Sequence, residues 1–166
     1  MGASWSGAGC RALMTAVRLI AVGQKMPTWV EAGCQEYLPR FRHQFRLTLE
    51  TLPASKRTGE AAQLEHARSL QGRLKTSDFL ILLDERGESY STESLAQQLT
   101  QWEFIGRPLV FAIGGADGWA ESTRQRAEGL WSLSQLVFPH PLVRILVIEQ
   151  LYRADALRQG HPYHRG

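Results

Sequence analysis

Residues 79–113 read FLILLDERGESYSTESLAQQLTQWEFIGRPLVFAI, and this stretch decides the fold class. Its first five and last five residues are uninterrupted apolar runs, the pattern of strands that are buried on both faces of a sheet. Between them, Ser91 can cap a helix that continues to about Ile105. The stretch therefore predicts a strand, a covering helix and a second strand.

The same alternation continues in both directions along the chain. The other expected elements are a strand at 17–22, a helix between Pro27 and Pro39, a strand at 45–49, a helix at 60–75, a short helix near 120–130, the segment 133–138 and a helix at 142–159. Five strands alternating with five helices predict an α/β fold with a mostly parallel sheet and helices on both faces.

Length and composition are typical of one globular domain. The chain has 166 residues, of which 43% are hydrophobic and 21% charged, and this balance excludes a disordered or coiled-coil protein. Residues 1–13 are small, Gly/Ser-rich and unpatterned, and we expect a disordered leader or a start site placed too early. The predicted domain is then 14–166. No apolar run approaches the roughly 18 residues of a membrane span, so no membrane partner is expected.

The cysteines and the charges bear on compartment and partners. Cys10 and Cys34 fit neither a C-x-x-C pair nor a zinc-site spacing, which favours a reduced, cytoplasmic compartment and no metal bound by thiolates. Residues 1–83 carry 11 basic and 6 acidic side chains, whereas residues 84–166 carry 8 and 10. Most basic residues are arginine, which suits RNA or nucleotide phosphates, although a base composition that favours Arg codons explains the excess equally well.

Two predicted strands end in residues suited to a ligand site. The run at 79–83 stops at Asp84, and the run at 109–113 leads into a turn with glycines at 114, 115 and 118. Ligands of open parallel sheets bind outside the carboxyl ends of the strands, and glycines allow the backbone to approach them closely. The turn matches neither the dinucleotide fingerprint nor a P-loop, so an ordinary tight turn is an equal alternative.

The C-terminal residues 161–165 (HPYHR) bring two imidazoles, a phenol and a guanidinium together just past a helix end. These groups suit general acid/base chemistry or a phosphate contact. The alternatives are a frayed polar tail, or a metal site in which His140 joins His161 and His164. No carboxylate or cysteine completes such a site, so no metal is expected.

The chain resembles the bacterial ribosomal large-subunit methyltransferase H family, which belongs to the SPOUT class. The matching motifs run in the same order from Met14 to the C-terminus: Ala21-Val22-Gly23, Lys25-Met26-Pro27, Trp29-Val30, Leu83-Asp84, Ile113-Gly114-Gly115, 131–134 (WSLS), 139–144 (PHPLVR), 149–154 (EQLYRA) and 161–165 (HPYHR).

The resemblance implies a SPOUT-type fold with a C-terminal trefoil knot, a topology that general folding rules would discount. It also implies a homodimer that uses S-adenosylmethionine to methylate N3 of a pseudouridine in a stem-loop, helix 69, of 23S ribosomal RNA within the ribosome. The cofactor contacts that it implies fall on Leu83, Gly114, Leu133, Ser134, Gln135, Leu136, Val137 and Phe138.

Methylation of this imide nitrogen requires alignment with the methyl donor and removal of the N3 proton. The candidate catalytic residues are His140, His161, Tyr163, His164 and Arg165. Any of the histidines, or none, can be the base, and Arg165 can stabilise negative charge on the uracil oxygens or bind a phosphate. The competing hypotheses are a non-catalytic ribosome- or RNA-binding module with the same fold, and a nucleotide-binding enzyme unrelated to RNA.

Overall fold

The computed structural model describes residues 15–42 and 45–165, and the predicted leader, 1–13, lies outside them. Its centre is a five-stranded sheet in the order β2-β1-β4-β3-β5, in which every pairing is parallel. The strands are β1 (Thr15–Val22), β2 (Phe45–Leu52), β3 (Phe79–Ser89), β4 (Leu109–Ile113) and β5 (Gly129–Ser132). The predicted parallel sheet is therefore confirmed.

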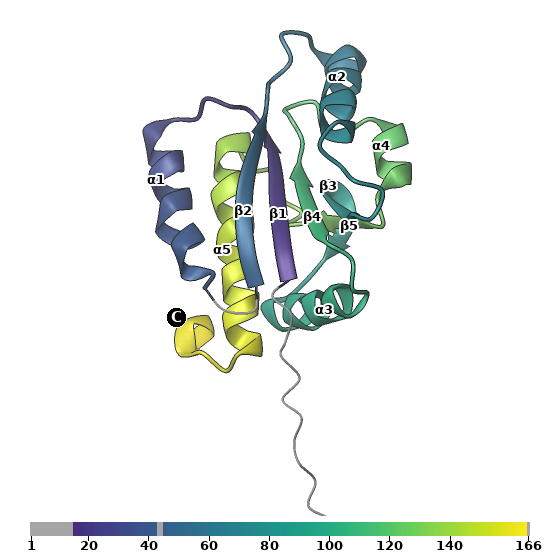
Figure 1. Cartoon of the computed structure of the whole chain (residues 1–166). Helices are drawn as coiled ribbons and strands as arrows, with labels where there is room; N and C mark the ends of the chain where they lie inside the picture. The colour runs from purple at the N-terminus through teal and green to yellow at the C-terminus, as the bar shows by residue number, and fades with distance from the viewer. Residues whose placement is uncertain (1–14, 43–44, 166) are drawn as a thin grey trace, which may run out of the picture.

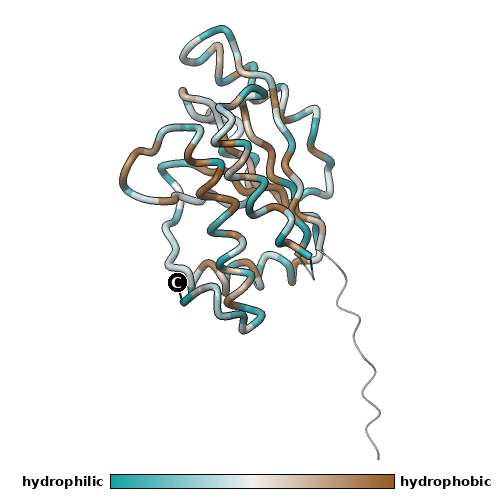
Figure 2. Tube along the Cα trace, turned by 90° about the vertical axis from the view of Figure 1, so that its left-hand side faces the viewer, coloured by the Kyte–Doolittle hydropathy of each residue, from teal (hydrophilic) through white to brown (hydrophobic). Residues whose placement is uncertain are grey.

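Helices cover both faces of the sheet, as predicted (Figure 1). They are α1 (Thr28–Tyr37), α2 (Gly59–Gln71), α3 (Thr92–Phe104), α4 (Glu121–Arg126) and α5 (His140–Arg158), with short 3-10 turns η1 (Leu38–Arg40) and η2 (Pro162–Arg165). Helices α1, α3 and α5 pack on one face, and α2 packs on the other. In Figure 2 the hydrophobic parts of the trace gather in the centre of the molecule, where the strands lie.

Helices cover the central strands on both faces, so neither face is open to solvent. All five residues of β4 are buried, and in β1 Leu19 and Ala21 belong to the core under α5 whereas Ile20 and Val22 belong to the core on the opposite face. A strand covered by helices on both faces needs apolar side chains at successive positions, which explains the continuous runs in the sequence.

Several boundaries differ from the predictions: β2 extends to Leu52 rather than 49, and α2 ends at Gln71 rather than 75. The fifth strand is Gly129–Ser132 rather than the segment 133–138, and the short helix ends at Arg126. Strand β3 does not end at Asp84: it leaves the ladder after Leu83 and rejoins it where Glu88 pairs with Trp131. The polar residues of this bulge hide the continuation, because only pairing with β5 makes them part of a strand.

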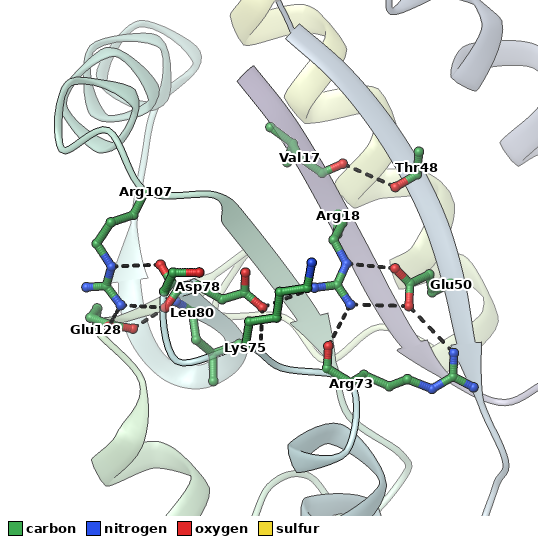
Figure 3. Close-up of polar contacts among 11 residues, drawn as sticks. Val17, Arg18, Thr48, Glu50, Arg73, Lys75, Asp78, Leu80, Arg107 and Glu128 are labelled. Atoms are coloured by element: carbon green, nitrogen blue, oxygen red, sulfur yellow. Dashed lines mark hydrogen bonds and ion pairs between the residues drawn. The ribbon is translucent and has the colours of Figure 1, made fainter. Parts of the chain in front are cut away.

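Figure 3 shows a polar network that joins β1 and β2 to the chain entering β3. The Arg18 guanidinium donates from Nε to Glu50 Oε1 at 2.7 Å, from Nη1 to Asp78 Oδ2 at 3.1 Å and from Nη2 to the Arg73 carbonyl at 2.8 Å. Asp78 also accepts from the Lys75 backbone N–H at 2.8 Å. One side chain thus positions three segments that are far apart in sequence.

The described residues were also expected to contain no membrane-spanning segment. No helix among them is long and apolar enough to cross a membrane.

Cys34 is buried and unpaired, and burial raises the pKa of its thiol. Cys10 lies outside the described residues.

The Arg18–Glu50 pair predicts a pH-dependent loss of stability in Glu50→Gln. At pH 7 we expect the melting temperature to fall by about 2–4 °C, which corresponds to about 1 kcal/mol, because glutamine still accepts a hydrogen bond and only the charge is lost. The hydrogen bond from Arg18 lowers the pKa of Glu50, so this stabilisation is complete above the ordinary glutamate value of about 4.3 and is lost as pH falls through the lowered one. The difference from wild type should therefore close on acidification in a thermal-melt series.

The matched control is Glu36→Gln, which removes an exposed i,i+4 pair with Arg40 and should change stability little. A difference between Glu50→Gln and wild type that persists unchanged at low pH would contradict the role given to the carboxylate.

Candidate functional site

A cavity of about 850 Å³ opens at the carboxyl ends of β3, β4 and β5. Its lining consists of residues 83–86, 113–118, 124, 131–138, 140 and 143. Leu83, Gly114 and all six residues of 133–138, the predicted cofactor contacts, are therefore brought together around one space. This is the edge at which an open parallel sheet is expected to bind ligands.

The segment 133–138 reaches the cavity because of where its two ends are fixed. It leaves β5 at one edge of the sheet and enters α5, whose first residue, His140, contacts the end of β1. Strands β3 and β4 lie between those points, so the segment crosses their carboxyl ends. Leu136 and Val137 in this segment are 72% and 89% exposed, so apolar side chains stand at the cavity without a partner in the described part of the chain.

The glycine turn forms the floor next to β4. Gly118 has φ +73° and donates its N–H to the Gly115 carbonyl at 3.0 Å, so it closes a tight turn in a conformation that favours glycine. Packing also restricts the other two glycines: a Cβ on Gly115 would clash with His66 Cε1 at 2.7 Å, and one on Gly114 would make a tight contact of 3.2 Å with the Trp119 indole. Protein side chains behind the turn, and not only a ligand in front of it, exclude larger residues here.

His66 packs behind the turn as a neutral imidazole. Its Nε2 accepts the Ser55 backbone N–H at 3.0 Å, so the proton lies on Nδ1, and burial lowers the pKa of the ring. Nδ1 and the Trp119 Nε1 are both buried without a hydrogen-bond partner among the described residues.

Two side chains at the start of α5 bind the carboxyl end of β1. His140 Nε2 donates to the Val22 carbonyl at 2.6 Å, and Arg144 Nη2 donates to the carbonyls of Val22 at 3.2 Å and Gly23 at 2.8 Å. Burial lowers the pKa of His140, so its ring is neutral at pH 7 and only Nδ1 is left to accept a proton. His140 is the one predicted catalytic residue that lines the cavity within the described residues.

The C-terminal candidates lie at the other end of α5, a helix of 19 residues and about 28 Å. Tyr163 packs edge-on against Tyr152 with ring centroids 4.8 Å apart and donates its hydroxyl to Glu149 Oε1 at 3.2 Å. Burial, with Tyr37 and Glu149 nearby, raises the pKa of this phenol, so it stays protonated at pH 7. Figure 1 shows the C-terminal segment beside the lower end of α5, far from the end of the sheet that carries the cavity.

Consequently one chain does not unite the predicted catalytic residues. Two further candidates, His161 and Arg165, lie in the tail with Tyr163. The backbone N–H of His161 donates to the Ala156 carbonyl at 2.9 Å. The His164 side chain is not among the parts of the chain that the structure describes. His140 and His161 flank α5 and cannot share a metal ion within one chain. The described residues contain no group of three His, Cys, Asp or Glu side chains suited to a metal.

Comparisons with known proteins match the same part of the chain. A family model described as "Predicted SPOUT methyltransferase" matches residues 15–164. Proteins named ribosomal RNA large subunit methyltransferase H are 45% identical in Thioalkalivibrio sulfidiphilus and 42% identical in Hahella chejuensis and Acinetobacter baumannii. Each alignment covers 90% of this chain and 98% of the relative.

The chain belongs to the SPOUT methyltransferases, in the large-subunit methyltransferase H family. The resemblance inferred from the sequence motifs is thereby confirmed. The trefoil knot that it implies stays a prediction.

The cavity of this SPOUT methyltransferase also contains an ion pair between Asp84, which the sequence placed at the ligand-binding edge, and Arg124, which it did not single out. Asp84 Oδ2 accepts from Arg124 Nε at 2.7 Å, and the two side chains are only 3% and 14% exposed. Asp84 directly follows the apolar run of β3, which is a usable signal for a site residue. Arg124 lies on a short polar helix with one other arginine, Arg126, and nothing in the sequence distinguishes the two.

The packing behind the glycine turn predicts that Gly115→Ala destabilises this SPOUT methyltransferase. Its new Cβ would overlap the His66 ring, and overpacking of this kind costs about 1–3 kcal/mol of unfolding free energy in a urea titration. Gly72→Ala is the matched control, because Gly72 has helical φ and ψ of −66° and −14° and its Cβ would meet only ordinary contacts. It should be neutral or stabilising by up to about 1 kcal/mol. Equal stability of the two variants would contradict the contact between His66 and the turn.

Proposed function

We propose that this protein is a cytoplasmic, S-adenosylmethionine-dependent methyltransferase that methylates N3 of a pseudouridine in helix 69 of 23S ribosomal RNA on the ribosome. The observation that carries the proposal is the 42–45% identity, over nearly their full length, to proteins named ribosomal RNA large subunit methyltransferase H.

The cavity fits S-adenosylmethionine in size and chemistry. Its volume of about 850 Å³ lies within the range of small-molecule sites, roughly 300–1,000 Å³. The backbone at Gly114 and along 133–138 can recognise an adenosine, and apolar side chains such as Leu133 and Val143 can contact its rings. When bound, the cofactor supplies an electrophilic methyl group, and the task left to the protein is alignment and proton removal.

The charge states at the site restrict how the N3 proton can leave. Neutral His140 lines the cavity, but its Nε2–H is held by the Val22 carbonyl, so only Nδ1 can act as a base. Tyr163 is protonated and acts as a hydrogen-bond donor. His161 and His164 are the alternative bases, and the third alternative is a tail that positions the RNA without taking a proton.

A role for the tail at the cavity requires a second copy of the chain. His161 follows the far end of α5, and the Tyr163 hydroxyl folds back only as far as Glu149, which lies nine residues, or about 14 Å along the helix, from His140 at the cavity. A two-fold homodimer can bring the tail of one subunit to the cavity of the other. Such a dimer is part of the proposed function.

The exposed arginines support an RNA partner. Arg86 at the rim of the cavity has a side chain that is 61% exposed, and Arg165 in the tail is exposed as well. Guanidinium groups in these places can bind phosphates on either side of a base that is presented to the site.

The direct test incubates the protein with labelled S-adenosylmethionine and ribosomes from cells that lack the modification. We expect label on one pseudouridine of helix 69, and no transfer to ribosomes that already carry the methyl group. Ribosome binding without transfer would indicate a non-catalytic module instead. Cofactor binding without any ribosome affinity would favour an enzyme unrelated to RNA.

A second prediction separates the tail from the cavity. A chain that ends at Gln159 should bind S-adenosylmethionine within a few-fold of wild type in calorimetry, because the cavity contains no tail residue. Methyl transfer should fall by two or more orders of magnitude, the scale expected when an acid/base group and a positioning contact are lost together.

Single variants apportion this loss. Arg165→Ala should act mainly on ribosome affinity and His161→Ala or His164→Ala on turnover. Tyr163→Phe keeps the ring contact with Tyr152 and removes only the hydroxyl. Normal methylation by the shortened chain would show that the tail is not part of the active site.

A further inference from the structure

The Asp84–Arg124 pair lies in the wall of the cavity and is mostly shielded from solvent. Two charged groups held this far from water are costly unless their remaining hydrogen-bonding capacity is used. Asp84 meets this condition within the protein, since Oδ2 accepts from Arg124 Nε and Oδ1 accepts from the Arg86 backbone N–H at 3.0 Å.

The hydrogen-bonding capacity of Arg124, by contrast, is only partly used within the described protein. Its Nε is engaged by Asp84, and its Nη1 has only a long contact of 3.5 Å to Glu121, whose side chain is 62% exposed. Its Nη2 lies 3.7 Å from the position of a Cβ on Gly118 and makes no hydrogen bond to the described residues. The outer edge of the guanidinium, Nη1 and Nη2, is therefore available beside the glycine turn.

From this arrangement we infer that Arg124 binds the carboxylate of the amino-acid end of the cofactor, and that Asp84 is a positioning residue which aims the guanidinium. The inference rests on the proposed function. A guanidinium whose Nε is fixed by one carboxylate presents two parallel N–H donors to a second, the geometry of a bidentate pair. Only a glycine at position 118 leaves the turn beside Nη2 without a side chain.

The alternative anion, an RNA phosphate, fits this site less well. The Arg124 side chain is 14% exposed, whereas Arg86 nearby is 61% exposed. A phosphate of an RNA backbone is bulky and reaches exposed arginines first. A carboxylate at the end of a small ligand can reach a recessed one.

Equilibrium dialysis with two probes tests the inference. S-adenosylhomocysteine has the amino-acid end, and 5′-methylthioadenosine has the same nucleoside and thioether without it. We expect wild type to prefer the first probe, and Arg124→Gln to reduce that preference about 10- to 100-fold through weaker binding of the first probe alone. Arg124→Lys keeps the charge without the fork and should restore part of the preference.

Asp84→Asn keeps an acceptor for Nε but not its charge, so it should reduce the same preference less than Arg124→Gln does. The matched control is Arg126→Gln, on the same short helix, because Arg126 bonds Gln71 outside the cavity and its loss should leave both affinities unchanged. Melting curves confirm that each variant is folded.

Each of the following results would overturn the inference. If both probes bound equally more weakly to Arg124→Gln and Arg124→Lys, the Asp84–Arg124 pair would have only a structural role. Unchanged binding of both probes with reduced ribosome affinity would assign Arg124 to a phosphate. Failure of folded wild type to bind either probe would reject the proposed cofactor itself, whereas normal wild-type binding with an unchanged preference in the variants rejects only the role of Arg124.

Discussion

The carbonyl of Val22 is the point on which the geometry of the site depends. It accepts hydrogen bonds from His140 and Arg144, which lie 118 and 122 residues further along the chain. These bonds fix the start of α5 at the end of β1. Because β5 lies at the far edge of the sheet, the segment 133–138 can reach α5 only across the ends of β3 and β4. The cavity is therefore a consequence of where α5 is anchored.

This anchor uses backbone carbonyls instead of carboxylates. Arg144 is 4% exposed, its pKa is lowered by burial, and no salt bridge to it occurs among the described residues. Carbonyls at the end of a strand have no further strand partner, so they can accept these bonds without breaking the ladder. A positive charge also remains under the site. The Arg18 network is the counterpart near the amino ends of the strands, and there carboxylates balance the charge.

The sequence predicts an element or a site residue when the pattern that marks it lies within that element itself. Buried strands such as Leu109–Ile113 are predictable because both faces demand apolar residues. Strand β5 is not, because its four residues are a strand only through their pairing with β3, and the continuation of β3 is not, because it rejoins that pairing only beyond a bulge of polar residues. The residues around the cavity were indicated by the ends of apolar runs and by family motifs. Arg124 was missed because its importance comes from Asp84, 40 residues away, and not from its neighbours in sequence.

The position of the tail changes how its chemistry has to be understood. A frayed end would have to be ordered at each encounter with RNA, at an entropic cost for every residue. Residues Pro162–Arg165 instead form a 3-10 turn, and Tyr163 is held by Tyr152, Glu149 and the Arg153 guanidinium, 5.0 Å from its ring. Part of the conformational entropy of the tail is therefore already lost when the chain folds, before RNA binds. The tail is therefore held in place along the side of α5, away from the cavity end at His140, before any RNA is bound.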